Sequence, residues 1–177
     1  MKLVVLDRDG TINHDSDQYI KSPAEWKPIK GSLEAIARLT QDGWRVVVAT
    51  NQSGIGRGLF DMATLNAIHD LMHRAVHQAG GRIDAIFFCP HADQSGCECR
   101  KPRPGMLLEI GKRLNVPMEG VPVVGDSLRD LQAAAAAGAK PVLVLTGKGR
   151  KAREAGGLPA GTAIFPDLAA FAAQHAP

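Results

Sequence analysis

Short apolar runs alternate with segments of helical periodicity along this chain, and this alternation constrains the fold more than any other feature. Five runs bounded by turn residues predict strands over residues 3–6, 45–50, 83–88, 121–124 and 141–145, with a short sixth over 163–165. Helical spacing predicts helices over about 32–43, 61–79, 104–114 and 128–137, the first capped by Ser32. Near-continuous apolar strands are typical of a sheet covered on both faces. We therefore expect an α/β fold with a doubly wound, mostly parallel sheet.

The size and charge of the chain limit what it can be. Its 177 residues fit a single domain over 1–177 with a core of its own. The chain has no long apolar run and no secretory apolar segment, so we expect a cytoplasmic protein with no membrane partner. A net charge of +3 without a basic run, together with 5% aromatic residues, argues against nucleic acid as a partner. We also expect a monomer.

Polar residues stand where the predicted strands end. Asp7 and Asp9 follow the first strand, Thr50 and Asn51 end the second, and Asp126 follows the fourth. The carboxyl ends of parallel strands meet at one edge of a sheet, where ligands of such folds bind. We therefore expect these side chains to line one cleft.

Three carboxylates in one cleft, those of Asp7, Asp9 and Asp126, repel one another unless one is protonated or a divalent cation lies between them. Ligands that are all oxygen atoms favour a hard ion, so the sequence predicts a Mg²⁺ site completed by a substrate phosphate. The alternative is that each aspartate only caps a helix or forms a turn. That explanation serves a single aspartate well, but it serves three at strand ends poorly.

Four short motifs, in order along the chain, resemble those of the haloacid dehalogenase (HAD) superfamily of phosphotransferases. The first two are LVVLDRDGTI at residues 3–12 and VVVATN at residues 46–51. The third is Lys101 within RKP, and the fourth is GDSLRD at residues 125–130. The resemblance covers residues 3–130, and it implies a Rossmann-like core and a phosphoric monoester hydrolase.

This resemblance implies a role for each aspartate of the predicted cleft. Asp7 would attack phosphorus to form an aspartyl phosphate, and Asp9 would be the general acid for the leaving oxygen and then the base for water. Mg²⁺ would be held by the Asp7 carboxylate, the Asp9 backbone carbonyl and the Asp126 carboxylate. Asp130 would support this metal site from behind.

The resemblance also implies which residues contact the substrate. Thr50 and Asn51 would hydrogen-bond the phosphoryl oxygens, and Lys101 would offset charge on the phosphoryl group and the nucleophile. Many HAD phosphatases carry an inserted cap domain, but the interval of about 35 residues from Asp9 to the second strand leaves no room for one. Substrate recognition would then fall to loop residues, which are Asp15, Gln18, Gln52, Ser53, Arg57 and Arg100.

All three cysteines and one histidine fall within 11 positions of one predicted loop. They are Cys89, His91, Cys97 and Cys99. Three thiolates and one imidazole make the ligand set of a closed structural zinc site, although paired ligands usually stand further apart, and reduced cysteines packed in a loop are the alternative. A subgroup of the HAD superfamily carries the same cluster. We therefore expect a structural Zn²⁺ that holds the loop leading to Lys101.

The segments DRDGTIN (7–13), TNQSGIGRG (50–58) and CRKPRPGM (99–106) resemble one family within the superfamily, the heptose 1,7-bisphosphate 7-phosphatases. The resemblance implies removal of the 7-phosphate from this sugar bisphosphate, in nucleotide-heptose synthesis for the lipopolysaccharide core. A second substrate anion would suit a positive cluster of Arg57, Arg100 and Arg103. Histidinol-phosphate phosphatases are the alternative, but they usually carry an aspartate where this chain has Ser53. A zinc-stabilised binding module without catalysis is a further alternative.

Three other features are expected to lie outside the chemistry. His69, His73 and His77 recur every four residues beside an apolar stripe, and we expect them on a solvated helix face rather than at a metal. The glycines of residues 54–58 do not open a helix after the first strand, so we expect a flexible substrate loop rather than a dinucleotide site. We expect Lys148 to face solvent.

Overall fold

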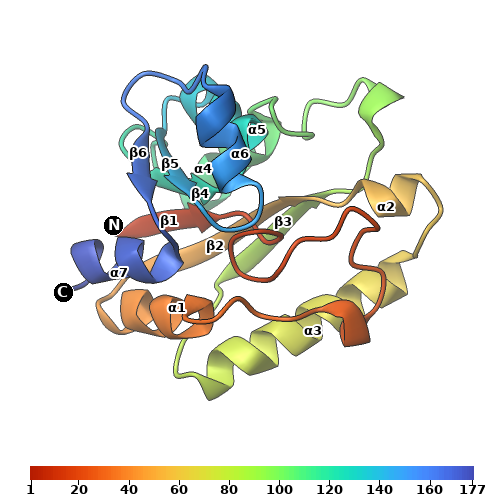
Figure 1. The fold of residues 1–177 in the computed structure, drawn as a ribbon, viewed down its shortest axis with the longest axis horizontal. Coiled ribbons are helices and arrows are strands. Elements are labelled where there is room, and N and C mark those ends of the chain that lie inside the picture. The colour runs from red at the N-terminus through yellow and green to blue at the C-terminus, as the bar shows by residue number, and fades with distance from the viewer.

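A computed structural model describes residues 1–177. The chain folds around one six-stranded sheet (Figure 1). All strand pairs are parallel, and the order across the sheet is β3-β2-β1-β4-β5-β6. The strands are β1 (Leu3–Leu6), β2 (Arg45–Asn51), β3 (Ala85–Cys89), β4 (Pro122–Gly125), β5 (Lys140–Val144) and β6 (Ala163–Phe165). The predicted α/β fold with a doubly wound parallel sheet is confirmed.

Helices cover both faces of the sheet. They are α1 (Ser32–Gln41), α2 (Ser53–Gly56), α3 (Met62–Gln78), α4 (Gly105–Leu114), α5 (Leu128–Ala136), α6 (Gly149–Ala155) and α7 (Leu168–His175), with 3-10 turns at Pro23–Glu25 and Asp93–Ser95. In Figure 1, α1, α3 and α7 lie along one side of the sheet, and α4, α5 and α6 lie on the other. Every helix is too short or too polar to cross a bilayer.

The core consists of two apolar layers, because successive side chains of a strand point to opposite faces. In β1, Val4 and Leu6 pack into the layer beneath α1, α3 and α7, whereas Leu3 and Val5 pack into the layer beneath α4 and α5. All four side chains are buried. Burial on both faces explains why the sequence of this strand is apolar throughout instead of alternating.

The ends of several elements differ from the sequence-based expectation. Ser32 is the first residue of α1 rather than its cap, because its hydroxyl donates to the carbonyl of Thr11 and ties the helix to the loop after β1. The third strand begins two residues later than predicted, at Ala85, and ends at Cys89. The short helices α2, α6 and α7 were not expected. A short helix carries too few periodic positions to be read from sequence.

The strand order determines where the cleft forms. After β1 the chain builds outward through β2 and β3, then crosses back so that β4 lies on the other side of β1. A crevice forms at such a switch point, outside the carboxyl ends of the strands on either side. The loops that follow β1, β2 and β4 therefore converge, as the motif positions predicted.

Candidate active site

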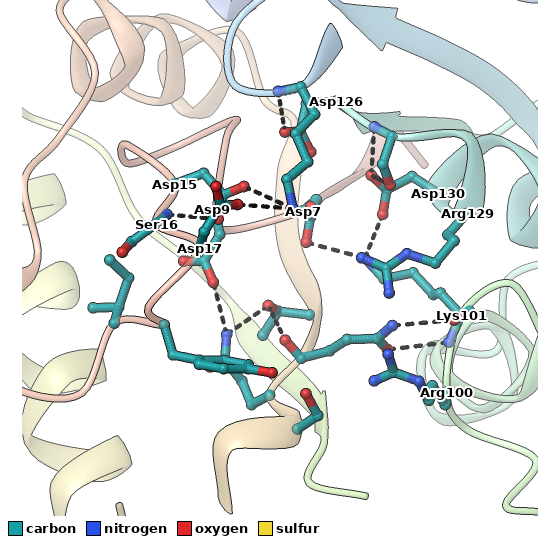
Figure 2. Close-up of a pocket in the computed structure, with 18 of the residues that line it drawn as sticks. Asp7, Asp9, Asp15, Ser16, Asp17, Arg100, Lys101, Asp126, Arg129 and Asp130 are labelled. Carbon is teal, nitrogen blue, oxygen red and sulfur yellow. Dashed lines mark hydrogen bonds and ion pairs between the residues drawn. The ribbon is translucent and has the colours of Figure 1, made fainter. Parts of the chain in front are cut away.

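A polar cleft of about 260 Å³ lies at this switch point. Figure 2 shows Asp7 near its centre, with Asp15, Ser16 and Asp17 on one side and Lys101, Arg100 and Arg129 on the other. Only two of its 20 lining residues are hydrophobic. The site residues predicted from sequence that line it are Asp7, Asp9, Asp15, Thr50, Asn51, Gln52, Ser53, Arg57, Arg100, Lys101 and Asp126.

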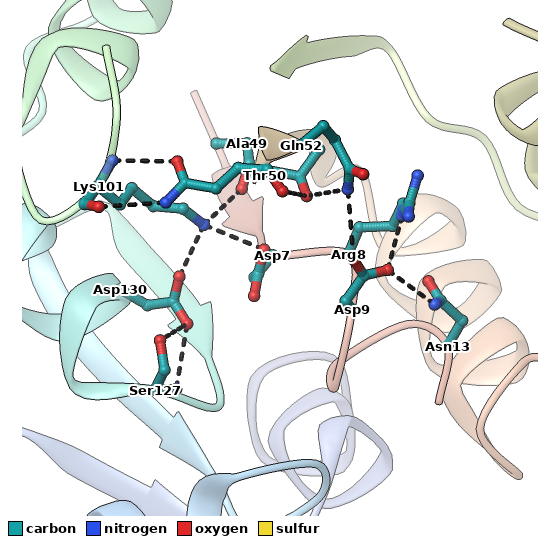
Figure 3. A network of polar contacts seen from close by, with 11 residues as sticks. Asp7, Arg8, Asp9, Asn13, Ala49, Thr50, Gln52, Lys101, Ser127 and Asp130 are labelled. Atoms are coloured by element: carbon teal, nitrogen blue, oxygen red, sulfur yellow. Dashed lines mark hydrogen bonds and ion pairs between the residues drawn. The ribbon is translucent and has the colours of Figure 1, made fainter. Parts of the chain in front are cut away.

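Lys101 is the only cation in contact with the innermost carboxylates, and its side chain is buried. Its ammonium donates to Asp7 Oδ1 at 3.0 Å, to Asp130 Oδ1 at 2.6 Å and to the carbonyl of Ala49 at 2.8 Å. The other Asp130 oxygen accepts from the backbone and the hydroxyl of Ser127 at the start of α5. Both Asp130 oxygens are thus occupied, and the lysine is fixed between two carboxylates (Figure 3).

Crowding of negative charge sets the electrostatics of this corner. Burial, followed by the charge of Asp130, raises the pKa of Asp7 to about 7. Burial and then the charge of Asp7 raise the pKa of Asp126 to about 9. Burial alone would lower the pKa of Lys101, but the Asp130 and Asp7 carboxylates raise it above its ordinary value. One lysine therefore does not neutralise the three carboxylates, and the arrangement has room for a further cation.

The donor set fits a hard divalent ion. Carboxylate oxygens of Asp7, Asp126 and Asp130 lie within 4.8 Å of one another, and oxygen-only ligands of this kind suit Mg²⁺. The backbone leaves no space for a larger residue beside Asp126, since a Cβ on Gly10 or Gly147 would lie 1.9 or 2.2 Å from its Oδ2. The Lys148 backbone N–H donates to the same Oδ2 at 2.9 Å. Asp126 is thereby fixed in orientation.

Asp9 is held by its own set of donors on the loop after β1 (Figure 3). Its Oδ1 accepts from Arg8 Nε at 2.8 Å and from Asn13 Nδ2 at 2.9 Å, and its Oδ2 accepts from Gln52 Nε2 at 3.3 Å. Burial acts to raise the pKa of Asp9, but the Arg8 charge and these hydrogen bonds outweigh it and leave the pKa below its ordinary value. Asp7 and Asp9 therefore occupy opposite electrostatic environments although they are two residues apart.

His69 corrects the expectation of a solvated histidine face. It lies buried on α3, where its Nε2 is 3.1 Å from Arg8 Nη1, whereas His73 and His77 are exposed as predicted. A guanidinium can only donate, so His69 accepts through Nε2. Burial, with the nearby Arg8 charge, lowers the pKa of His69 to about 3 and keeps the imidazole neutral. Helical periodicity did not predict the burial of His69, because this turn of α3 packs against the buried guanidinium of Arg8 instead of facing water.

Thr50 and Asn51, at the end of β2, make different kinds of contact. The buried Thr50 hydroxyl accepts from Gln52 Nε2 at 2.9 Å. The Asn51 side chain instead makes a pair of bonds to the Lys101 backbone, accepting from its N–H at 3.0 Å and donating to its carbonyl at 3.1 Å. Asn51 therefore aligns Lys101 with β2, a role that its sequence position alone did not indicate.

Arginines form one rim of the cleft. Arg100 and Arg57 both approach Asp93 Oδ1, at 2.6 and 3.4 Å, and Arg100 Nη1 is buried without a hydrogen-bond partner. Arg103 was expected with them, but it lies outside the cleft and donates to the carbonyl of Cys97. The 54–58 segment that carries Arg57 is not the loop that was expected, because Ser53–Gly56 forms α2.

Acidic residues and Lys148 form the opposite rim. Lys148 was expected in solvent, but it lines the cleft and its ammonium lies 3.3 Å from Asp15 Oδ2 and 3.9 Å from Asp17 Oδ1. Gln18 was expected to bind substrate and is not among the lining residues. A turn with Tyr19 in the left-handed region (φ 65°) exposes Gln18 and directs Tyr19 into the cleft.

Seven lining residues were not named individually by sequence reasoning. They are Ser16, Asp17, Tyr19, Ile20, Asp93, Ser127 and Arg129. Ser127 and Arg129 lie within the fourth motif, so their place beside Asp126 was open to prediction from the strand-end rule. Ser16 and Asp17 lie in the 15–18 loop, and Asp93 lies in the Cys/His loop, both of which were expected to contact substrate. Tyr19 and Ile20 follow a turn that depends on tertiary contacts, and no sequence signal identified them.

The cysteines and the histidine come together beyond β3, as their spacing predicted. Cys89 Sγ lies 3.6 Å from Cys97 Sγ and 3.0 Å from Cys99 Sγ, and both Cys89 and Cys99 lie 3.5 Å from His91 Nδ1. A tetrahedral ion with bonds of roughly 2.3 Å separates its ligands by roughly 3.7 Å. No disulfide forms. These four side chains could therefore hold one tetrahedral metal ion.

Comparison with known proteins relates this site to characterised ones. A profile of HAD-hydrolase-like proteins matches residues 98–171. D-glycero-beta-D-manno-heptose-1,7-bisphosphate 7-phosphatase of Bordetella bronchiseptica is 64% identical over 174 residues, 98% of this chain and 97% of the relative. The protein of the same name from Pseudomonas putida is 55% identical over 98% of this chain and 99% of its own. This chain belongs to the heptose-1,7-bisphosphate 7-phosphatase family.

A solved structure supports the same family membership. The crystal structure of the B. bronchiseptica D,D-heptose 1,7-bisphosphate phosphatase, complexed with magnesium and phosphate, superimposes with a TM-score of 0.98. It is 64% identical and covers 99% of this chain and 98% of its own. The resemblance to the HAD superfamily, and to this family within it, is confirmed.

Proposed function

We propose that this chain removes the 7-phosphate of D-glycero-beta-D-manno-heptose 1,7-bisphosphate. The observation that carries the proposal is the placement of Asp7 and Asp9 two residues apart in one polar cleft at the end of β1, in a chain 64% identical to a phosphatase of that name. Asp7 contacts a lysine and has an oxygen free of protein donors, whereas Asp9 is held by a cation behind it. A nucleophile needs an oxygen free to approach phosphorus, and a proton donor needs a fixed orientation toward the leaving oxygen.

The chemistry then proceeds in two steps. In the first, an Asp7 oxygen forms a bond to phosphorus as the bond to the sugar oxygen breaks, and Asp9 gives its proton to that leaving oxygen. In the second, water gives a proton to Asp9 and attacks phosphorus, which breaks the bond to Asp7 and releases phosphate. Lys101 offsets charge on Asp7 and on the phosphoryl oxygens, and Thr50 contacts the phosphoryl group.

We propose that Mg²⁺ is held by the Asp7 and Asp126 carboxylates and the Asp9 backbone carbonyl, with Asp130 outside the coordination shell. Support comes from the crowding of these carboxylates and from the magnesium bound by the B. bronchiseptica relative. Asp130 is placed outside because Lys101 and Ser127 already occupy both its oxygens. When bound, the ion neutralises charge on the reacting phosphoryl group.

The second phosphate of the substrate is assigned to the arginine rim. Arg100 has a buried nitrogen free of partners, and Arg57 lies beside it, although both are partly satisfied by Asp93. Ser53, Gln52 and the opposite rim of Asp15 and Lys148 would then contact sugar hydroxyls. Two anions at the two ends of one sugar match a cleft that would offer Lys101 and a bound Mg²⁺ at its centre and arginines at one rim.

We propose that the four-ligand cluster of Cys89, His91, Cys97 and Cys99 holds a structural Zn²⁺. The near-tetrahedral separations of the ligand atoms support this ion, and all four protein ligands leave no open position for catalysis. The ion would fix the loop that delivers Arg100 and Lys101 to the cleft. Free thiols of this kind suit the reducing cytoplasm, where we place the protein.

The cellular role proposed is a step in nucleotide-heptose synthesis for the lipopolysaccharide core. We propose a single capless domain over residues 1–177 that acts as a monomer. Only a 3-10 turn and α1 lie between β1 and β2, which supports recognition by loops rather than by a cap.

The test is a comparison of kcat/KM for heptose 1,7-bisphosphate, fructose 1,6-bisphosphate and histidinol phosphate in the presence of Mg²⁺. We expect a preference for the heptose substrate, because its second phosphate can reach the arginine rim. A preference for histidinol phosphate would overturn the substrate assignment, and no turnover of any of the three would overturn the enzymatic function.

A further inference from the structure

Arg8 is a buried cation whose role the proposed chemistry leaves unexplained. It lies between Asp7 and Asp9 in sequence, yet its side chain turns away from the cleft and is fully buried. Its guanidinium contacts Asp9 through Nε at 2.8 Å (Figure 3). It also contacts a second side chain, His69, through Nη1 at 3.1 Å. Its remaining nitrogen, Nη2, has no hydrogen-bond partner.

Burial makes the pairing with Asp9 obligatory. A guanidinium does not lose its proton in proteins, so Arg8 stays charged, and Asp9 is the one carboxylate that contacts it. A buried charge without a partner is strongly unfavourable. Asp9 cannot swing away from this position without leaving that charge uncompensated.

His69 selects the orientation of the guanidinium. The imidazole accepts from Nη1, which directs the neighbouring Nε toward Asp9 instead of toward another part of the core. Because His69 is itself buried on the 17-residue helix α3, its position is fixed by the packing of Ile68 and Met72 against the sheet. The contact therefore links the helix layer to the loop after β1.

The two Asp9 oxygens are left in different conditions. Oδ1 accepts two short bonds, from Arg8 and from Asn13 at 2.9 Å, whereas Oδ2 accepts one longer bond of 3.3 Å from Gln52. A carboxyl oxygen that already accepts two hydrogen bonds is poorly placed to carry a proton. Oδ2 is thus the oxygen left to exchange a proton with the substrate.

We propose that Arg8, oriented by His69, is a positioning residue that fixes Asp9 Oδ1 and so presents Oδ2 to the leaving oxygen of the substrate. The inference rests on the proposed function, because it assumes that Asp9 transfers a proton during phosphoryl transfer. Arg8 and His69 act through Asp9 and do not touch substrate.

The experiment compares substrates that need a proton on the leaving oxygen with one that does not. A sugar oxygen leaves poorly as an alkoxide, whereas nitrophenolate is a stable anion. Values of kcat/KM are measured for heptose 1,7-bisphosphate and for p-nitrophenyl phosphate with wild type, Arg8→Lys, His69→Leu and His69→Gln. Asp9→Asn supplies the reference for complete loss of the proton donor, and His73→Leu, an exposed site on the same helix, supplies the control.

We expect Arg8→Lys to lower kcat/KM for the heptose substrate about 100-fold and for the nitrophenyl substrate less than about threefold, since general acid catalysis is worth roughly 10²–10⁴-fold. His69→Leu should lower the first value about tenfold. His69→Gln should restore most of the loss, because its carbonyl can accept from Arg8. Misfolded protein lowers both values by one factor, so the ratio is insensitive to stability.

Equal losses with both substrates would overturn the inference, because they would indicate a merely structural role. Unchanged values in Arg8→Lys would overturn it as well. If wild type prefers histidinol phosphate, the proposed substrate fails, and the same comparison is made with that alkyl phosphate. If wild type hydrolyses no phosphate ester, the proposed function and the inference both fail.

Discussion

Two clusters of side chains in this molecule could hold a metal ion, and they are built in different ways. The Cys/His cluster comes from one loop, and its four ligands lie within 11 positions of each other in sequence. The carboxylate cluster joins Asp7, which follows β1, to Asp126 and Asp130, which follow β4. One cluster is local, and the other depends on the whole sheet.

The charges of the two clusters differ as much as their origins. The carboxylates are buried beside Lys101, and burial raises the pKa of Asp7 and Asp126. The Cys/His cluster is more exposed, with only Cys89 fully buried. Its four side chains would complete the shell of a tetrahedral ion, whereas an ion between the carboxylates would keep coordination positions for a substrate. The difference indicates that an ion at the Cys/His cluster would stabilise a loop, whereas an ion at the carboxylates would contact the reacting substrate.

Replacing Lys101 with Met should have the largest effect on the carboxylate side. Asp7 and Asp130 would lose their shared partner, at a cost of about 3–5 kcal/mol in the free energy of unfolding. Loss of charge stabilisation should lower kcat by roughly 10²–10³-fold. Urea unfolding and phosphate release measure the two effects. Lys112→Met on the exposed face of α4 is the control, and an equal loss there would contradict the comparison.

Removing metal should expose the crowding of charge in the cleft. Asp7 and Asp126 have folded pKa values of about 7 and about 9, above the ordinary value of 3.8, so the folded state binds more protons than the unfolded state between these limits. Stability of chelated protein should therefore fall as pH rises from about 4 to about 9. Thermal unfolding with EDTA and with Mg²⁺ measures this, and Mg²⁺ should flatten the profile. A chelated protein whose Tm rises over this range would contradict it.

Breaking the Cys/His cluster should have a smaller effect. Cys99→Ser should release the metal and lower kcat/KM by about 10–100-fold, because the loop that carries Lys101 loses its anchor. The two apolar layers should still unfold cooperatively, since neither depends on this loop for most of its members. Metal content and activity are measured together, with Gln94→Ala as the control. Full activity without the metal would show that the cluster does not position the cleft.

The smallest expected effect concerns the arginine rim. Arg100→Ala should raise KM for heptose 1,7-bisphosphate by about tenfold, since a hydrogen bond to a charged group is worth about 1.5–3 kcal/mol. It should leave kcat within about threefold, because the rim lies away from Asp7. Arg113→Ala on α4 is the matched control. A change in kcat with constant KM would place Arg100 in the chemistry instead.

The comparison also explains how much could be predicted from sequence. The place of Asp7, Asp9 and Asp126 followed from strand ends, and that of Lys101 from a motif, because parallel strands bring their carboxyl ends together. The Cys/His cluster followed from spacing. The roles of residues that depend on side-chain orientation could not be predicted from the sequence.

Three residues illustrate that limit. His69 has the spacing of a polar face but is buried against Arg8, a charge that no period reveals. Gln18 is turned outward by the left-handed backbone of Tyr19. Lys148 reaches the cleft because Gly147 packs close to Asp126, a contact across more than 20 residues of chain.

The central claim is that Asp7 carries the phosphoryl group. Wild type is mixed briefly with heptose 1,7-bisphosphate and Mg²⁺, quenched in acid, digested with pepsin and analysed by mass spectrometry. We predict a phosphate on Asp7 in wild type and none in Asp7→Asn, which should also lose roughly 10⁴-fold or more in kcat. Substantial turnover by Asp7→Asn, or phosphate found on another residue, would contradict the account.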